Sequence, residues 1–200
     1  MNNIKYILDT CSINNDICVS IDATYKLVDN SWCVIILGVF ATVYNTDKRF
    51  VQRCYPCMIT VAKSESTVTI ESNIQSLKNI IQKMYNLNVT INSITMDHSA
   101  AIMKGIDNVF GDVKPTIISC YFHLMQSVKK KIPKPDAYQL VFSHLSLLRV
   151  TKNDVLFNIA VGLIISIWKG DSRFKSIEIW FQNTYLTPPW SLWRYNVGKD

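Results

Sequence analysis

Residues 17–28 decide the fold class of this chain, and they read ICVSIDATYKLV. The run from Ile17 to Ile21 is rich in β-branched side chains, so the stretch predicts a β-strand that continues through Val28. Asp22 interrupts this apolar strand at a place where an unpaired charge would be costly. Asp22 is therefore the first candidate functional residue.

Two more strands follow the first one after short connections. Residues 29–31 have the composition of a turn, and residues 32–40 are apolar nearly throughout, as expected of a strand covered on both faces. After a polar break at residues 45–49, residues 55–62 predict a third strand. Three successive strands with short turns indicate an antiparallel meander.

The hydrophobic period changes after the third strand, from two residues to three or four. The next predicted elements are a helix over 71–87, a strand over 89–96, a helix capped by Ser99 and closed by Gly111, a strand over 116–120, and a basic helix over 123–132 that is stopped by Pro133 and Pro135. The resulting order, β-β-β-α-β-α-β-α, is that of the ribonuclease-H-like fold, an α/β fold with a mixed five-stranded sheet.

The chain changes character after Pro135. Three helices are predicted, over 137–150, 153–169 and 172–183, and no strand pattern interrupts them. We therefore expect three parts: a lead-in segment over 1–16, a ribonuclease-H-like core over 17–133, and an all-helical insertion or subdomain over 134–200.

The composition is that of an ordinary globular chain, since 48% of the 200 residues are hydrophobic and 18% are charged. The net charge of +6 favours phosphate backbones, although many proteins without a nucleic-acid partner are equally basic. No secretory signal precedes the six cysteines, so we expect free thiols in an intracellular, reducing compartment. The longest apolar runs, 32–43 and 155–168, are shorter than the roughly 20 residues of a membrane-spanning helix, and we expect a soluble protein.

A second aspartate, Asp97, stands at the end of the fourth predicted strand. In a sheet of the predicted order the first and fourth strands are neighbours, so Asp22 and Asp97 would meet at one edge. Two carboxylates at one edge suit Mg²⁺, and two such ions about 3.5–4 Å apart can promote phosphodiester cleavage. The alternative is structural, because an aspartate at a strand end commonly initiates a turn or caps a helix.

Three blocks of the sequence carry a resemblance to a known family. Residues 22–27, DATYKL, are similar to the D-[GA]-T-[FY]-K opening of the MULE (Mutator-like element) transposase domain. Residues 96–102 with residues 109–111 resemble the second-aspartate segment of that family, and residues 120–132 resemble its C-x-F-H-x-x-Q segment with a basic helix. The blocks occur in the family's order and cover about residues 18–132.

The resemblance implies a DDE-type DNA transposase core in the nucleus, with Asp22 and Asp97 as catalytic metal ligands. It further implies Mg²⁺ or Mn²⁺, two ions in a complete site, and DNA as partner, both transposon ends and target. A homo-oligomer is a further candidate partner, while no membrane and no small-molecule cofactor are expected. Cys120 and His123 would lie near the site or contact DNA. The lysines Lys129, Lys130 and Lys131 fit a DNA-backbone contact and a solvated helix face equally well.

The third carboxylate of the family is expected on a helix beyond a W-x-x-x-[YF] stretch. Residues 190–195 are similar to that stretch, and the chain ends at Asp200 before such a helix, while Glu178 lies upstream and is not assigned. We therefore expect a truncated chain that is inactive as given. The alternatives are a transposon-derived, non-enzymatic DNA- or protein-binding module and, more weakly supported, another ribonuclease-H-like nuclease acting on RNA–DNA hybrids.

The remaining chemistry concerns cysteines. Cys54 and Cys57 could complete a zinc site with Cys120 and His123, or all of these cysteines could pack as small apolar groups. Redox activity of the C-x-x-C pair is disfavoured because the pair leads into a strand and not a helix. The sequence contains no Gly-rich phosphate loop, no G-x-S-x-G and no H-E-x-x-H, which argues against P-loop and serine-hydrolase classes.

Overall fold

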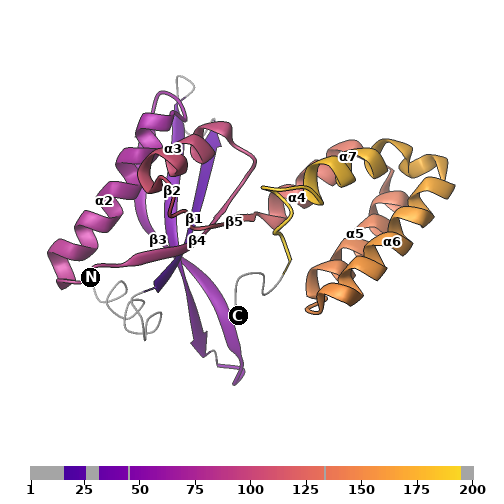
Figure 1. Ribbon diagram of the computed structural model, residues 1–200, viewed down its shortest axis with the longest axis horizontal. Helices are drawn as coiled ribbons and strands as arrows, with labels where there is room; N and C mark the ends of the chain where they lie inside the picture. Colours follow the sequence, from indigo (N-terminus) through magenta and orange to yellow (C-terminus); the bar gives the residue numbers. More distant parts are fainter. Residues whose placement is uncertain (1–15, 26–31, 45, 133, 195–200) are drawn as a thin grey trace. The chain divides into compact units, whose positions relative to one another are not determined.

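The structure, a computed structural model, describes residues 16–25, 32–44, 46–132 and 134–194. The predicted lead-in segment up to residue 15, the last three residues of the first predicted strand and the predicted turn at 29–31 lie outside the described residues. The chain forms two compact units, Met1–Ile117 and Ile118–Asp200, and each is described by itself (Figure 1).

The first unit is built on a five-stranded sheet with the order β3-β2-β1-β4-β5. β1 pairs antiparallel with β2 and β2 pairs antiparallel with β3, whereas β1 pairs parallel with β4. The predicted α/β class, meander and mixed five-stranded sheet are thereby confirmed. The strands span β1 Asp16–Tyr25, β2 Cys33–Tyr44, β3 Phe50–Ala62, β4 Thr90–Met96 and β5 Thr116–Ser119.

β2 and β3 are longer than predicted. β2 continues to Tyr44, and β3 begins at Phe50 instead of residue 55, because the two strands stay paired up to Tyr44 and Phe50. Gln52 and Arg53 in this extension are exposed. The polar residues at this exposed hairpin end do not predict a strand, because the strand is stabilised by backbone pairing.

Helices α2 Thr67–Tyr85 and α3 Ala100–Phe110 lie side by side next to the sheet (Figure 1). The predicted cap is confirmed, since the Ser99 side chain accepts a hydrogen bond from the Ile102 amide, and Gly111 ends α3 with a φ of 56°. α2 begins earlier than predicted because Ser66 caps it by accepting from the Thr69 amide at 3.2 Å.

The alternation of β1 separates two faces of the sheet. Ile17, Val19 and Ile21 are buried, and Ile21 is aligned with the buried Leu37 of β2. The same face carries Thr60 of β3, whose hydroxyl donates to Asn73 Oδ1 of α2 at 2.9 Å. α2 therefore packs on the face that carries Ile21, and the even-numbered residues of β1 belong to the opposite face.

The second unit is helical. It contains α4 Tyr121–Lys131, α5 Pro135–Val150, α6 Asp154–Gly170, the 3-10 helix η2 Ser172–Phe174 and α7 Lys175–Tyr185, so the predicted helices after Pro135 are confirmed. They share one apolar core, made of Leu124, Met125, Val128, Ile132, Ala137, Val141, Leu145, Leu148, Phe157, Ile164, Ile165, Trp168, Phe174, Ile177, Phe181, Tyr185 and Trp193. α4 contributes to this core, whereas the sequence analysis grouped it with the sheet.

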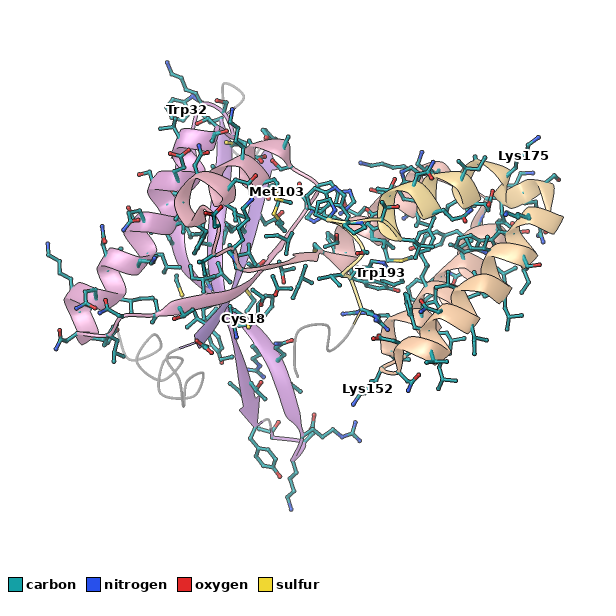
Figure 2. The ribbon with its side chains drawn as sticks, in the orientation of Figure 1. Cys18, Trp32, Met103, Lys152, Lys175 and Trp193 are labelled. Atoms are coloured by element: carbon teal, nitrogen blue, oxygen red, sulfur yellow. The ribbon has the colours of Figure 1, made fainter. Side chains whose placement is uncertain are left out.

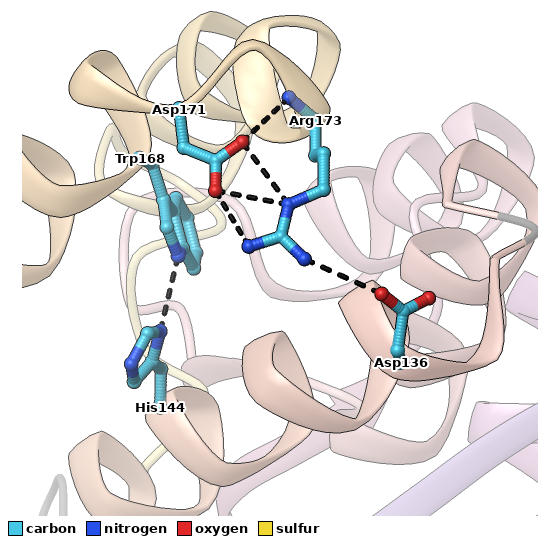
Figure 3. Close-up of polar contacts among 5 residues, drawn as sticks. All are labelled: Asp136, His144, Trp168, Asp171 and Arg173. Carbon is cyan, nitrogen blue, oxygen red and sulfur yellow. Dashed lines mark hydrogen bonds and ion pairs between the residues drawn. The ribbon is translucent and has the colours of Figure 1, made fainter.

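Aromatic side chains contribute to the core of the helical unit. Trp168 is fully buried, and its Nε1 donates to His144 Nδ1 at 3.1 Å (Figure 3). Trp193 points in among the helices and donates to the Tyr185 carbonyl at 2.8 Å (Figure 2). On the surface, Arg173 binds Asp171 at 2.7 Å and Asp136 at 3.3 Å (Figure 3).

Among the described residues, no single helix is long and apolar enough to cross a membrane. The pair formed by α6 and the segment Ser172–Tyr185 meets that criterion only when the two are taken together, and they are bent by 108°.

Candidate functional site

Asp22 lies near the end of β1, on the face of the sheet opposite α2. It is half-buried and aligned with Ile36 of β2, which in turn is aligned with Ile59 of β3. Ile59 is 65% exposed, so the Asp22 face lacks the cover that the α2 face has at this point. The carboxylate thus interrupts the apolar pattern of β1 without entering the core under α2.

Asp97 directly follows β4, the parallel neighbour of β1. The last aligned pairs of the two strands are Val19 with Ile94 and Ser20 with Thr95. Asp22 and Asp97 each stand two residues beyond that last pair. Neighbouring strands lie about 4.8 Å apart, and residues two apart on a strand share a face. The two predicted aspartates therefore lie at the same edge of the sheet, each just beyond the part of its strand where β1 and β4 pair.

The surroundings of the two carboxylates differ. Asp22 Oδ1 is shielded from solvent. Asp97 Oδ1 accepts a hydrogen bond from the Ser99 amide at 3.0 Å, which is the geometry of an Asx turn leading into α3. Asp97 therefore does form the turn that the sequence predicts as its alternative role. This turn does not exclude a metal role, because a carboxylate has two oxygens with about four acceptor positions.

Glu65 is an acidic residue of this region that the sequence analysis missed. It lies between β3 and α2, where the Tyr25 hydroxyl donates to its Oε2 at 2.7 Å and the Ser99 hydroxyl donates to its Oε1. The pKa of the Tyr25 phenol is raised, first by the hydrogen bond to Glu65, then by burial, and then by nearby charges that include Asp97. Knowledge of the strand register would have placed Glu65 near Tyr25. Tyr25 is aligned with Cys33, and Cys33 is aligned with Ala62, three residues before Glu65.

The described residues fit a metal ion only in part. Within each unit, the described residues contain no group of three or more His, Cys, Asp or Glu side chains arranged to hold one. Asp22 and Asp97 suit a Mg²⁺ ion that keeps several waters, whereas a complete two-ion site needs a further carboxylate. Glu178, in α7, is buried, receives a hydrogen bond from Gln182 and lies 3.7 Å from Lys169 Nζ.

Cys120 and His123 stand together at the start of α4, in the second unit. Burial raises the pKa of the Cys120 thiol, but hydrogen bonds from the His123 side chain and from the His123 and Phe122 amides outweigh burial and lower it. Cys57, by contrast, lies on β3, and its pKa is raised chiefly by burial. The two thiols therefore differ, because the partners of Cys120 outweigh its burial, whereas at Cys57 burial outweighs the hydrogen bond from the Val39 backbone.

The three predicted lysines occupy the last turn of α4, where positive charge is favourable at a helix C-terminus. Lys129, Lys130 and Lys131 are exposed, and Lys131 Nζ lies 4.9 Å from the centre of the Trp180 ring. Their exposure is compatible with both expectations, a solvated helix face and a contact with a phosphate backbone.

Comparison with protein-family models and with curated proteins identifies no relative of this chain, since no family model and no curated protein matches it. The resemblance to MULE transposases therefore rests on the three blocks of sequence.

Proposed function

We propose that this chain is the core of a Mutator-like DNA transposase of ribonuclease-H-like fold, with Asp22 and Asp97 as metal ligands. One observation carries the proposal: β1 and β4 are parallel neighbours, and each aspartate stands two residues beyond their last aligned pair, Ser20 with Thr95. The order β3-β2-β1-β4-β5 supports it, because a meander followed by parallel strands is the arrangement of that fold. The blocks that resemble the family contain both aspartates.

In this proposal the two carboxylates bind Mg²⁺ or Mn²⁺, with two ions expected in a complete site. Such ions stabilise charge on the attacking and leaving oxygens of a phosphodiester. Asp22 and Asp97 supply hard oxygen ligands, and the Ser99 amide orients Asp97 through its bond to Oδ1. Lys129 and the two lysines after it contribute to binding of the DNA backbone, and a DNA substrate implies a nuclear location.

A second candidate is a transposon-derived module that binds DNA or protein without cutting. It is favoured by the absence, among the described residues, of a group of three metal-binding side chains at the acidic pair. Both candidates share the fold and differ in chemistry. Cleavage assays therefore separate them, while metal binding tests the acidic pair itself.

Thermal unfolding with and without Mn²⁺ tests the metal site, because a ligand that binds the folded state raises the melting temperature. We expect Mn²⁺ to stabilise the wild type and to lose that effect in Asp22→Asn and Asp97→Asn. Asp112→Asn is the matched control, since Asp112 is exposed after the end of α3 and should leave the effect intact. Equal stabilisation of all four proteins, or none in the wild type, would refute the metal role.

Cleavage of transposon-end DNA in Mn²⁺ or Mg²⁺ is the companion assay. We expect no cleavage, or very weak cleavage, from this chain, because its described residues hold no group of three metal-binding side chains. Robust cleavage that Asp22→Asn and Asp97→Asn both abolish would show a complete active site and contradict the expectation of an inactive chain. Selective cleavage of RNA–DNA hybrids would favour the nuclease alternative.

A further inference from the structure

Glu65 links the two segments that carry the acidic pair. Its Oε2 accepts from Tyr25, three residues after Asp22 on β1, and its Oε1 accepts from Ser99, two residues after Asp97. A single half-buried carboxylate thus contacts the end of β1 and the turn after β4. These are the segments whose relative position fixes the separation of the two aspartates.

Ser99 strengthens this link, because its side chain and its amide together take part in three hydrogen bonds. Its hydroxyl donates to Glu65 and accepts from the Ile102 amide at 3.2 Å, and its own amide donates to Asp97 Oδ1 at 3.0 Å. The position of Asp97 is therefore coupled to the first turn of α3 and, through Glu65, to Tyr25. A carboxylate is suited to this task because both its oxygens accept, and charge-assisted bonds are stronger than neutral ones.

We propose that Glu65 is a positioning residue for the acidic pair, which holds the Asp97–Ser99 turn against the end of β1 and so sets the metal affinity of Asp22 and Asp97. This inference rests on the proposed function. Glu65 acts through its neighbours, since the described residues contain no group of three side chains that includes it and could hold a metal. Groups that hydrogen-bond a metal ligand directly, as the Ser99 amide does, typically change metal affinity by about 10–100-fold when they are removed, and Glu65 acts one bond further out through Ser99.

Glu65→Gln is the decisive variant, because an amide keeps only one acceptor oxygen and loses the charge. We expect its Mn²⁺ dissociation constant, measured by titration of the full chain, to rise about tenfold, the low end of the range for groups bonded directly to a metal ligand. The matched control is Glu71→Gln. Glu71 also accepts a side-chain hydrogen bond that joins α2 to α3, from Asn108, and should leave the Mn²⁺ constant within about twofold of wild type.

Amide hydrogen exchange provides a readout that does not depend on metal. In metal-free protein, we expect faster exchange at Ser99 and Ile102 in Glu65→Gln and unchanged exchange there in Glu71→Gln. Tyr25→Phe removes only the hydroxyl that donates to Glu65 Oε2, so it should also raise the Mn²⁺ dissociation constant and speed exchange at Ser99 and Ile102. It replaces Glu65→Gln as the test variant if Glu65→Gln folds poorly.

The outcomes separate the two claims. Absence of Mn²⁺ binding by the wild type overturns the proposed function, and the exchange rates still decide whether Glu65 holds the turn. If Mn²⁺ binds and Asp22→Asn abolishes it, while Glu65→Gln and Tyr25→Phe change neither the Mn²⁺ constant nor the exchange rates, the positioning role is wrong and the metal site stands.

Discussion

Gly105→Ala tests how closely α3 approaches α2, the packing that carries the Asp97–Ser99 turn. A Cβ at position 105 would lie 2.8 Å from Ile70 Cγ2 and 3.2 Å from the Thr67 carbonyl oxygen. Ile70 is fully buried and β-branched, so its methyl group cannot easily turn away. Overpacking of this kind costs about 1–3 kcal/mol, against about 1 kcal/mol gained by replacing glycine inside a helix.

Gly162→Ala is the matched control, because Gly162 lies inside α6 and a Cβ there meets nothing within 4 Å. It should gain helix propensity without a clash, so the change it causes in the unfolding free energy of its own unit should be more favourable, by about 1–3 kcal/mol, than the change Gly105→Ala causes in the first unit. Urea unfolding separates the units, since four of the five tryptophans lie beyond residue 118 and report on the helical unit. Circular dichroism follows the helices of both units, so Gly105→Ala should move to lower urea only the part of that transition that fluorescence does not follow, and it should leave the fluorescence midpoint unchanged. Equal stabilisation by both variants would show that α2 and α3 are not in close contact.

Three further predictions concern the helical unit. Burial lowers the pKa of His144 from its ordinary 6.5, and the neutral ring accepts a hydrogen bond from Trp168 at Nδ1. The stability that neutral His144 contributes is therefore fully present above about pH 6.5, and it is lost as the pH falls through the lowered pKa of the folded protein. His144→Gln should flatten the fall of melting temperature with acid, and an unchanged slope would contradict this. Cys120 should react with iodoacetamide at neutral pH faster than Cys57, as peptide mass mapping can measure, and the reverse order would refute the thiolate. Trp193→Phe should cost about 1–3 kcal/mol in urea unfolding, because it leaves a buried carbonyl without its donor, and a neutral result would contradict that bond.

The sequence predicted the elements well wherever side-chain periodicity and capping act locally. The Ser99 cap and the Gly111 terminus of α3 are present, and α6 spans Asp154–Gly170 against a predicted 153–169. The hairpin end of β2 and β3 was missed because its strands are fixed by pairing with each other and carry exposed polar side chains. Local patterns predict which residues form an element, and pairing decides how far it extends.

Packing partners were harder to predict than elements. α4 is amphipathic, and its sequence shows that one face is buried without showing against which neighbour. In the structure that face packs with α5 to α7. Glu65 was missed for a similar reason, because its place beside Tyr25 depends on the register across β1, β2 and β3 and no local motif marks it.

Asp97 shows how a structural role and a proposed chemical role can be separated in one residue. Its Oδ1 serves the turn into α3, so a stable turn alone would account for an aspartate at this position. Asparagine keeps that oxygen and forms the same turn, and it lacks the negative charge that a metal ion requires. Asp97→Asn should therefore preserve the melting temperature in the absence of metal and remove the response to Mn²⁺. A variant that loses stability without metal would assign Asp97 mainly to the fold, whereas selective loss of the Mn²⁺ response assigns it to the acidic pair with Asp22.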